Sequence, residues 1–72
     1  MVLLALLKID SHVKEHRLRL NYSQERLARE LGVSRQTVSN IEKGLSEPGV
    51  LLALGIAAIL GVAVADLFRR KS

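Results

Sequence analysis

The sequence predicts a single small all-α domain of five short helices. Its 72 residues suffice for one compact domain and are too few for two. Apolar residues make up 49% of the chain and charged residues 25%, a balance typical of a folded domain. Helix-forming residues predominate, and no alternation of apolar and polar residues persists long enough to indicate a strand. Because Tyr22 and Phe68 are the only aromatic residues, we expect an aliphatic core.

The first helix is expected to follow a cap at Asp10 or Ser11 and to run to about Leu20, with Val13 on its inner face. The residues before it, 1–7, are apolar throughout. Leucine and alanine favour an extension of the helix, whereas an apolar edge strand could pair across a dimer, and the sequence leaves both open. We therefore divide the chain into an apolar arm over 1–10, a domain over 11–68 and a basic tail over 69–72.

Two further helices follow, with a short turn between them. Ser23 can cap a helix over Gln24–Leu31, and Ser34 can cap the next helix over 35–43. Gly32 stands where a left-handed residue ends the first of the two, because glycine adopts positive φ without penalty. The positions expected to face the core are Leu27, Ala28, Leu31, Val38 and Ile41.

A fourth helix is expected over Val50–Leu60, introduced by the segment 47–49 and stopped by Gly61. A short fifth helix over about 64–68 would return Leu67 and Phe68 to the core.

The spacing of small and apolar residues across the second and third helices indicates a helix-turn-helix. Counting from Gln24, Ala28 is fifth, Gly32 ninth, Val38 fifteenth and Ile41 eighteenth. A methyl group fits at the fifth position, where two steeply crossing helices come closest. The fifteenth and eighteenth residues pack the third helix onto the body, so its opposite face is turned outward.

This outward face is expected to carry hydrogen-bonding side chains and no acid. They are Arg35, Gln36, Thr37, Ser39, Asn40 and Lys43. Arginine, glutamine and asparagine are residue types that read base edges in the major groove of DNA. A net charge of +4 also favours an anionic partner.

The run 23–44 resembles the helix-turn-helix of the Cro and phage-repressor (xenobiotic-response-element) family, and the likeness extends over about 13–68. The resemblance implies a compact, lambda-repressor-like domain. It also implies a sequence-specific regulator of transcription, in the first place a repressor, that binds double-stranded DNA. In a homodimer, two such helices related by a twofold axis would read an inverted repeat.

The resemblance further implies roles for single residues. Gln24, at a helix N-terminus, would contact a DNA phosphate. The base readers would be Arg35, Gln36 and Asn40. Contacts to the DNA backbone or to flanking base edges would come from Thr37, Ser39 and Lys43.

The resemblance also pairs Arg17 of the first helix with Glu42 of the third. A Glu42 that accepts two hydrogen bonds from the Arg17 guanidinium would be neutralised and would not repel phosphate. This would explain why an acidic residue can stand beside a DNA-facing helix. The alternative is that Glu42 faces solvent. The family commonly has hydroxyl residues where this chain has Gly49 and Ala63, so two helix caps are expected to be weaker.

The segment 49–65 has no charged residue, and Leu51, Gly55 and Ala58 stand at positions that are usually charged in the family. An isolated domain should not expose that much aliphatic surface. We expect a twofold homodimer to cover it, with 1–7 contributing. One alternative is a protein partner docked at the apolar ends, as in an antitoxin. The other is membrane association, which we do not expect because a 17-residue helix spans only about 26 Å of a ~30 Å hydrocarbon core.

Catalysis, cofactors and metals are not expected. The chain has no cysteine, so disulfides and thiolate metal sites are excluded, and a cytoplasmic location is expected. His12 and His16 have the spacing of a two-histidine metal site, but Glu15 is expected to point elsewhere and no third ligand is evident. No nucleophile–base arrangement, paired carboxylates or phosphate-binding loop can be placed, so the protein is not expected to be an enzyme.

Overall fold

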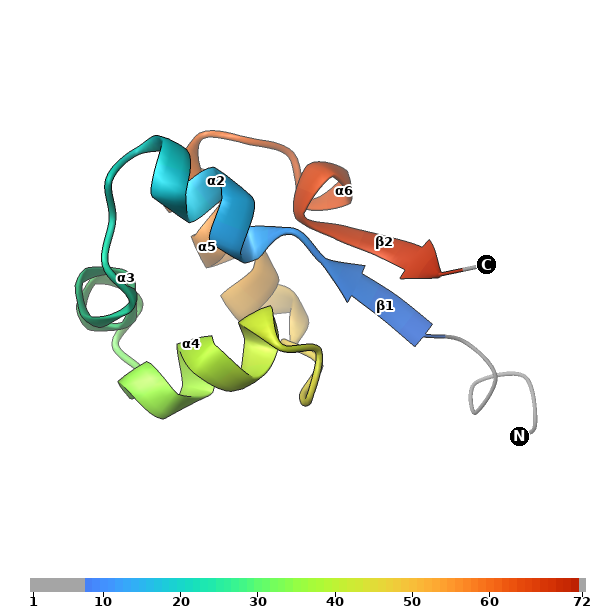
Figure 1. The fold of residues 1–72 in the computed structure, drawn as a ribbon, viewed down its shortest axis with the longest axis horizontal. Helices are drawn as coiled ribbons and strands as arrows, with labels where there is room; N and C mark the ends of the chain where they lie inside the picture. Colours follow the sequence, from blue (N-terminus) through green and yellow to red (C-terminus); the bar gives the residue numbers. More distant parts are fainter. Residues whose placement is uncertain (1–7, 72) are drawn as a thin grey trace.

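The computed structural model describes residues 8–71, which form a helical domain with a small sheet beside it (Figure 1). The helices in this part of the chain are α2 (Val13–Arg19), α3 (Gln24–Leu31), α4 (Arg35–Glu42), α5 (Val50–Leu60) and α6 (Val64–Leu67). Two short strands, β1 (Lys8–Ser11) and β2 (Phe68–Lys71), pair with each other. The described residues contain the five helices that the sequence predicts. The prediction of an all-α fold was wrong, because these two strands form a small sheet.

The sheet joins the two ends of the described chain. β1 and β2 are antiparallel, with Ser11 opposite Phe68 and Asp10 opposite Arg69. The amide of His12 then donates to the carbonyl of Leu67 at 2.7 Å, which ties the start of α2 to the end of α6. Residues 8–10 of the expected arm therefore pair with residues 69–71 of the expected tail, and the rest of both segments lies outside the described residues. Local sequence patterns could not reveal this pairing, because its partners lie 57 to 63 residues apart and each strand is only four residues long.

The strands also shift two of the expected helix ends. Asp10 and Ser11 belong to β1, so neither caps α2, which begins after His12 without a side-chain cap. Phe68 was expected to end the last helix, but its backbone is extended (φ −129°, ψ 115°) and it opens β2.

Helices α3 and α4 begin where the serines predict. The Ser23 hydroxyl accepts from the amide of Arg26 at 3.0 Å, and the Ser34 hydroxyl accepts from the amide of Thr37 at 3.1 Å. These contacts satisfy amides that have no partner within the first turn of a helix. Gly32 ends α3 with φ 76°, as expected.

Helix α5 has the expected bounds but no side-chain cap at Gly49. Helix α6 also lacks a hydroxyl cap, because Ala63 precedes it. A different contact stabilises its first turn: the amide of Ala63 donates to Asp66 Oδ2 at 3.2 Å. Gly55 of α5 was expected on the exposed face of the fourth helix. It faces α3 instead, because a Cβ there would lie 3.1 Å from Leu31 Cδ2. The glycine thus allows these two helices to approach closely.

The core of the described domain is aliphatic, as expected, and every long helix contributes to it. Its buried residues are Val13, Leu27, Ala28, Val38, Ile41, Ala53, Ile56, Ala57, Leu60 and Leu67. Tyr22 and Phe68 are partly buried and pack against this cluster. Because α2, α4 and α5 all meet at these residues, the core sets the position of α4 relative to the body.

The described residues contain no helix that is long and apolar enough to cross a membrane. The longest of them, α5, has 11 residues.

The left-handed conformation at Gly32 gives a test of the turn. In Gly32→Ala, alanine must adopt a left-handed backbone conformation that costs an L-residue about 1–2 kcal/mol. The substitution also lowers the entropy of the unfolded chain, which offsets part of this loss of stability. We expect a net loss of about 1 kcal/mol, or about 4–8 °C in Tm by calorimetry. Gly49→Ala is the matched control, because Gly49 also has open space around it but has φ −67°. Equal melting temperatures for the two variants would contradict the assignment.

Candidate nucleic-acid interface

Helix α4 lies across α3 at the surface of the domain. Figure 1 shows α3 almost end-on and α4 along its length, so their axes cross steeply. The turn between them is short, since α3 ends at Leu31 and α4 begins at Arg35. Val38 and Ile41 are fully buried beneath α4. The opposite face of the helix is therefore turned to solvent.

The three expected base readers lie on this outward face. Arg35 and Gln36 are exposed, and Asn40 is half-buried. Gln36 Nε2 donates to Asn40 Oδ1 at 2.9 Å, one helical turn away. Arg35 Nη1 is 3.8 Å from Glu25 Oε1 of α3, but both side chains are largely exposed. An exposed pair at this distance contributes little, so the guanidinium remains available to another partner.

The residues expected to contact the DNA backbone are placed differently from one another. Lys43 is exposed at the end of α4. Thr37 is half-buried, and its hydroxyl lies 2.9 Å from that of Ser34. Ser39 is only 9% exposed, so the expectation that it faces outward is wrong. It lies one turn before Glu42, whose side chain is also buried.

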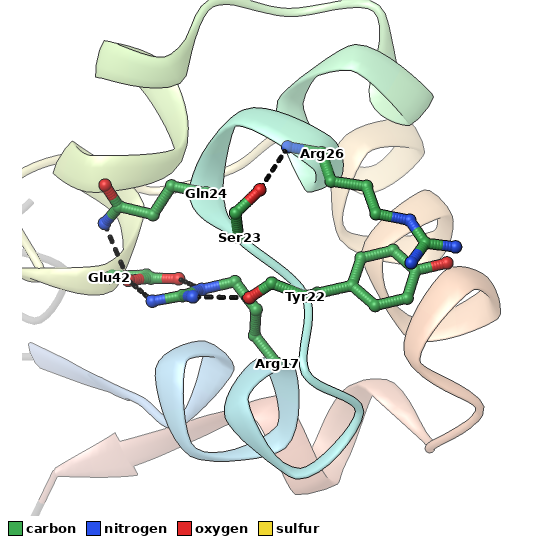
Figure 2. A network of polar contacts seen from close by, with 6 residues as sticks. All are labelled: Arg17, Tyr22, Ser23, Gln24, Arg26 and Glu42. Carbon is green, nitrogen blue, oxygen red and sulfur yellow. Dashed lines mark hydrogen bonds and ion pairs between the residues drawn. The ribbon is translucent and has the colours of Figure 1, made fainter.

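Glu42 is held by a buried network that joins three helices (Figure 2). Arg17 Nε of α2 donates to Glu42 Oε2 at 2.6 Å, and Arg17 Nη2 donates to Oε1 at 3.2 Å. Gln24 Nε2, in the first residue of α3, donates to Glu42 Oε1 at 3.0 Å. The two charged side chains are 8% and 4% exposed. The structure thus forms the pair that the resemblance implied, and Glu42 does not face solvent.

This network has two consequences for the outward face of α4. The carboxylate is neutralised by a bidentate guanidinium, so it does not repel an anion at that face. Gln24 is half-buried at the N-terminus of α3, and its amide is oriented by Glu42. The second hydrogen of Gln24 Nε2 remains free to donate.

Tyr22 is a part of the site that the sequence did not indicate. Its carbonyl accepts from Arg17 Nη1 at 2.7 Å and so completes the partners of the guanidinium (Figure 2). No side-chain pattern reveals a backbone acceptor in a loop. The Tyr22 ring also lies under Arg26, with the guanidinium carbon 4.0 Å from the ring centroid.

Arg26 lies at the surface and is engaged within the protein. Its Nε donates to Glu30 Oε2 at 3.0 Å, and Tyr22 donates to the other oxygen of the same carboxylate at 3.1 Å. The hydrogen bond with Glu30 raises the pKa of Arg26, so its positive charge is retained. The spacing of four between the arginine and the glutamate was a signal for this pair.

A metal site is not formed by the described residues. No group of three or more histidine or carboxylate side chains in 8–71 could hold an ion. His12 Nδ1 lies 3.2 Å from Glu15 Oε1, so the expectation that Glu15 points elsewhere is wrong. The contact is exposed and joins neighbours on one helix, which suits a surface pair.

These features define a helix-turn-helix domain. Two helices cross steeply, a glycine lies in the turn between them, and the second helix has an outward polar face. The family model described as Helix-turn-helix matches residues 13–67. The chain belongs to this family, in its Cro and phage-repressor type, and is a DNA-binding transcriptional regulator. Proteins of this class are not normally enzymes.

Curated relatives and solved structures agree with this assignment. The chain is 50% identical to the HTH-type transcriptional regulator YgzD of Bacillus subtilis and 48% identical to MJ0272 of Methanocaldococcus jannaschii. Each match covers 83% of this chain and 91% of the relative.

The fold is similar to that of the restriction-modification controller protein C.AhdI from Aeromonas hydrophila. The TM-score is 0.71 at 30% identity, over 78% of this chain and 85% of that one. It is also similar to the N-terminal DNA-binding domain of SinR from Bacillus subtilis, with a TM-score of 0.66 at 32% identity, over 72% and 77% of the two chains.

The role of the buried ion pair can be tested by measuring the free energy of unfolding. Arg17→Ala leaves Glu42 charged and without its main partner in a buried position, which costs about 3–5 kcal/mol. Arg29→Ala is the control, because Arg29 is exposed on α3 and its removal should cost less than about 0.5 kcal/mol. Urea denaturation measures both. If the two variants unfold at the same urea concentration, the pair does not hold the helices together.

Proposed function

We propose that this protein is a transcriptional repressor that binds an inverted repeat in double-stranded DNA as a homodimer. Each protomer would place α4 in the major groove of one half-site. The observation that carries this proposal is the division of α4 into two faces. Arg35, Gln36 and Asn40 face outward, while Glu42, its only acid, is withdrawn into a buried ion pair.

The geometry of the outward face supports separate roles for the base readers. Arg35 has a fork of donors that its exposed contact with Glu25 leaves available, and such a fork suits the O6 and N7 acceptors of guanine. In the hydrogen-bonded pair of Gln36 and Asn40, Gln36 Oε1 remains as an acceptor and Asn40 Nδ2 remains as a donor. Adenine presents the complementary N6 donor and N7 acceptor in the major groove. The pair would therefore read one adenine as a unit.

Phosphate contacts would come from residues at the borders of this face. Gln24 has a donor left over from its bond to Glu42 and lies beside the free amides at the N-terminus of α3. Lys43 is exposed at the other end of α4, and Thr37 lies on its flank. Ser39 is buried and is left out of the proposed interface.

The proposed homodimer rests on exposed apolar side chains around α5. Val50, Leu51 and Leu54 are 77%, 86% and 53% exposed, and Leu45 of the preceding loop is also exposed. No charge within 49–65 opposes contact between two copies. A twofold dimer would set two α4 helices about 34 Å apart, in successive major grooves on one side of the duplex. A different protein docked on these residues is the second candidate.

The base-reading role predicts a selective loss of affinity. Arg35→Ala should lower affinity for the operator by about 1–3 kcal/mol at each half-site and leave affinity for random DNA nearly unchanged. Lys43→Ala should weaken binding to both DNAs alike and reduce the salt slope by about one phosphate contact. Fluorescence anisotropy over a range of salt concentrations measures both effects. The operator comes from selection of bound sequences out of random duplex DNA.

A selected consensus without twofold symmetry would contradict the inverted repeat. An unchanged ratio of operator to random-DNA affinity in Arg35→Ala would contradict the role of Arg35.

The dimer predicts that charge on α5 disrupts assembly. Leu51→Glu should shift the sedimentation of the protein from dimer to monomer, because two carboxylates would be brought into an apolar contact. Leu18→Glu is the control, since Leu18 is 53% exposed but lies on α2. Both variants should keep their helical circular dichroism. A wild-type protein that sediments as a monomer at micromolar concentration would exclude the dimer and favour the second candidate.

A further inference from the structure

An apolar groove lies between the small sheet and the first half of α5. It has a volume of about 380 Å³. Ile9 and Phe68 line it from the sheet, and Val50, Ala53 and Leu54 line it from α5. Its lining residues carry no charge, although Arg69 and Arg70 of β2 lie next in sequence. Such a groove favours an occupant with apolar side chains and no charge of its own.

The groove is open to solvent in the single chain. Ile9, Val50 and Leu54 are exposed although each is a large aliphatic residue. A contiguous apolar surface on a small domain marks a site of contact. The core of this domain has few residues, so further burial would add substantially to its stability.

The chain itself contains a segment of the required chemistry. Residues 1–7 read MVLLALL and contain no charged or polar side chain. They join the described structure at Lys8, the first residue of β1. Seven residues reach at most about 25 Å, which is enough to pass beyond one protomer's sheet.

The direction of β1 decides between the groove of the same chain and that of a second copy. Figure 1 shows β1 running from its outer end inward to α2, with Lys8 at the outer end. The start of β1, to which residues 1–7 are attached, therefore lies away from the helical body. To enter its own groove it would have to reverse at once, yet residues 1–8 contain no Gly, Pro, Asn, Asp or Ser, the residues that favour tight turns.

We propose that residues 1–7 of each protomer lie in the groove of the other, so that two copies exchange their apolar N-terminal segments. A twofold axis would make the two contacts identical. The exchange rests on the homodimer of the proposed function and adds the groove beside α5 to the surface that holds the two copies together. The DNA-reading face on α4 takes no part in it, so assembly and recognition would use separate surfaces of the chain.

The absence of cysteine allows a direct test by disulfide trapping. One chain would carry Leu3→Cys, Leu4→Cys or Leu6→Cys singly, so that the register of the segment does not hide the contact. A second chain, distinguished by an affinity tag, would carry Leu54→Cys in the groove. The two chains would be refolded together, oxidised and analysed by mass spectrometry. Leu18→Cys is the matched control, because Leu18 and Leu54 are both 53% exposed.

We expect a disulfide between the two different chains for at least one of the three segment positions with Leu54→Cys, at several times its yield with Leu18→Cys. Equal yields with the two acceptors would overturn the exchange. A Leu4→Cys/Leu54→Cys double variant that forms only an intrachain disulfide would also overturn it, because each segment would then lie in its own groove.

Sedimentation of the cysteine-free protein separates the two proposals. A dimer without the specific cross-link would overturn the exchanged segments and leave the homodimer standing. A monomer would overturn both. Selection of operator DNA would still report on base reading by α4 in either case.

Discussion

The arrangement of this domain depends on the buried contact between Arg17 and Glu42. It links α2 to α4 directly, and through Gln24 and the carbonyl of Tyr22 it also holds the start of α3. Removing two charges from water is costly, and good geometry with further hydrogen bonds is needed to recover that cost. Here the guanidinium has three acceptors and the carboxylate three donors. The network is therefore best understood as a device that orients α4, rather than as a large source of stability.

The same contact shapes the chemistry of the outward face of α4. Val38 and Ile41 bury one side of α4, and the ion pair removes the only acid of the helix from solvent. What remains outward is a set of amide and guanidinium groups, two of which are held together by the bond from Gln36 to Asn40. A helix packed in this way can approach a polyanion without like-charge repulsion. Structural support and recognition are thus coupled through the orientation of one helix.

The apolar surface formed by α5 and the groove beside it would have a different task. Helix α5 supplies buried residues on one side and exposed leucines on the other, and the sheet adds a groove beside it. An aliphatic core of this size gains from any further burial, so contact between copies would serve stability as well as symmetry. An inverted repeat in DNA is bound by two recognition helices at a fixed spacing, so the same contact between copies would also set the distance between the two α4 helices.

The sequence by itself determined the number of helices, most of their ends and the helix-turn-helix. Ser23, Ser34 and Gly32 mark helix ends through bonds and dihedral angles that involve only near neighbours, and the spacing of Val38 and Ile41 places them on one face. Only the tertiary structure decided the pairing of β1 with β2, the burial of Ser39 and the close approach of α3 to Gly55. Each of these depends on segments that are distant in sequence and meet only when the core closes, and such contacts leave no periodic trace in the chain.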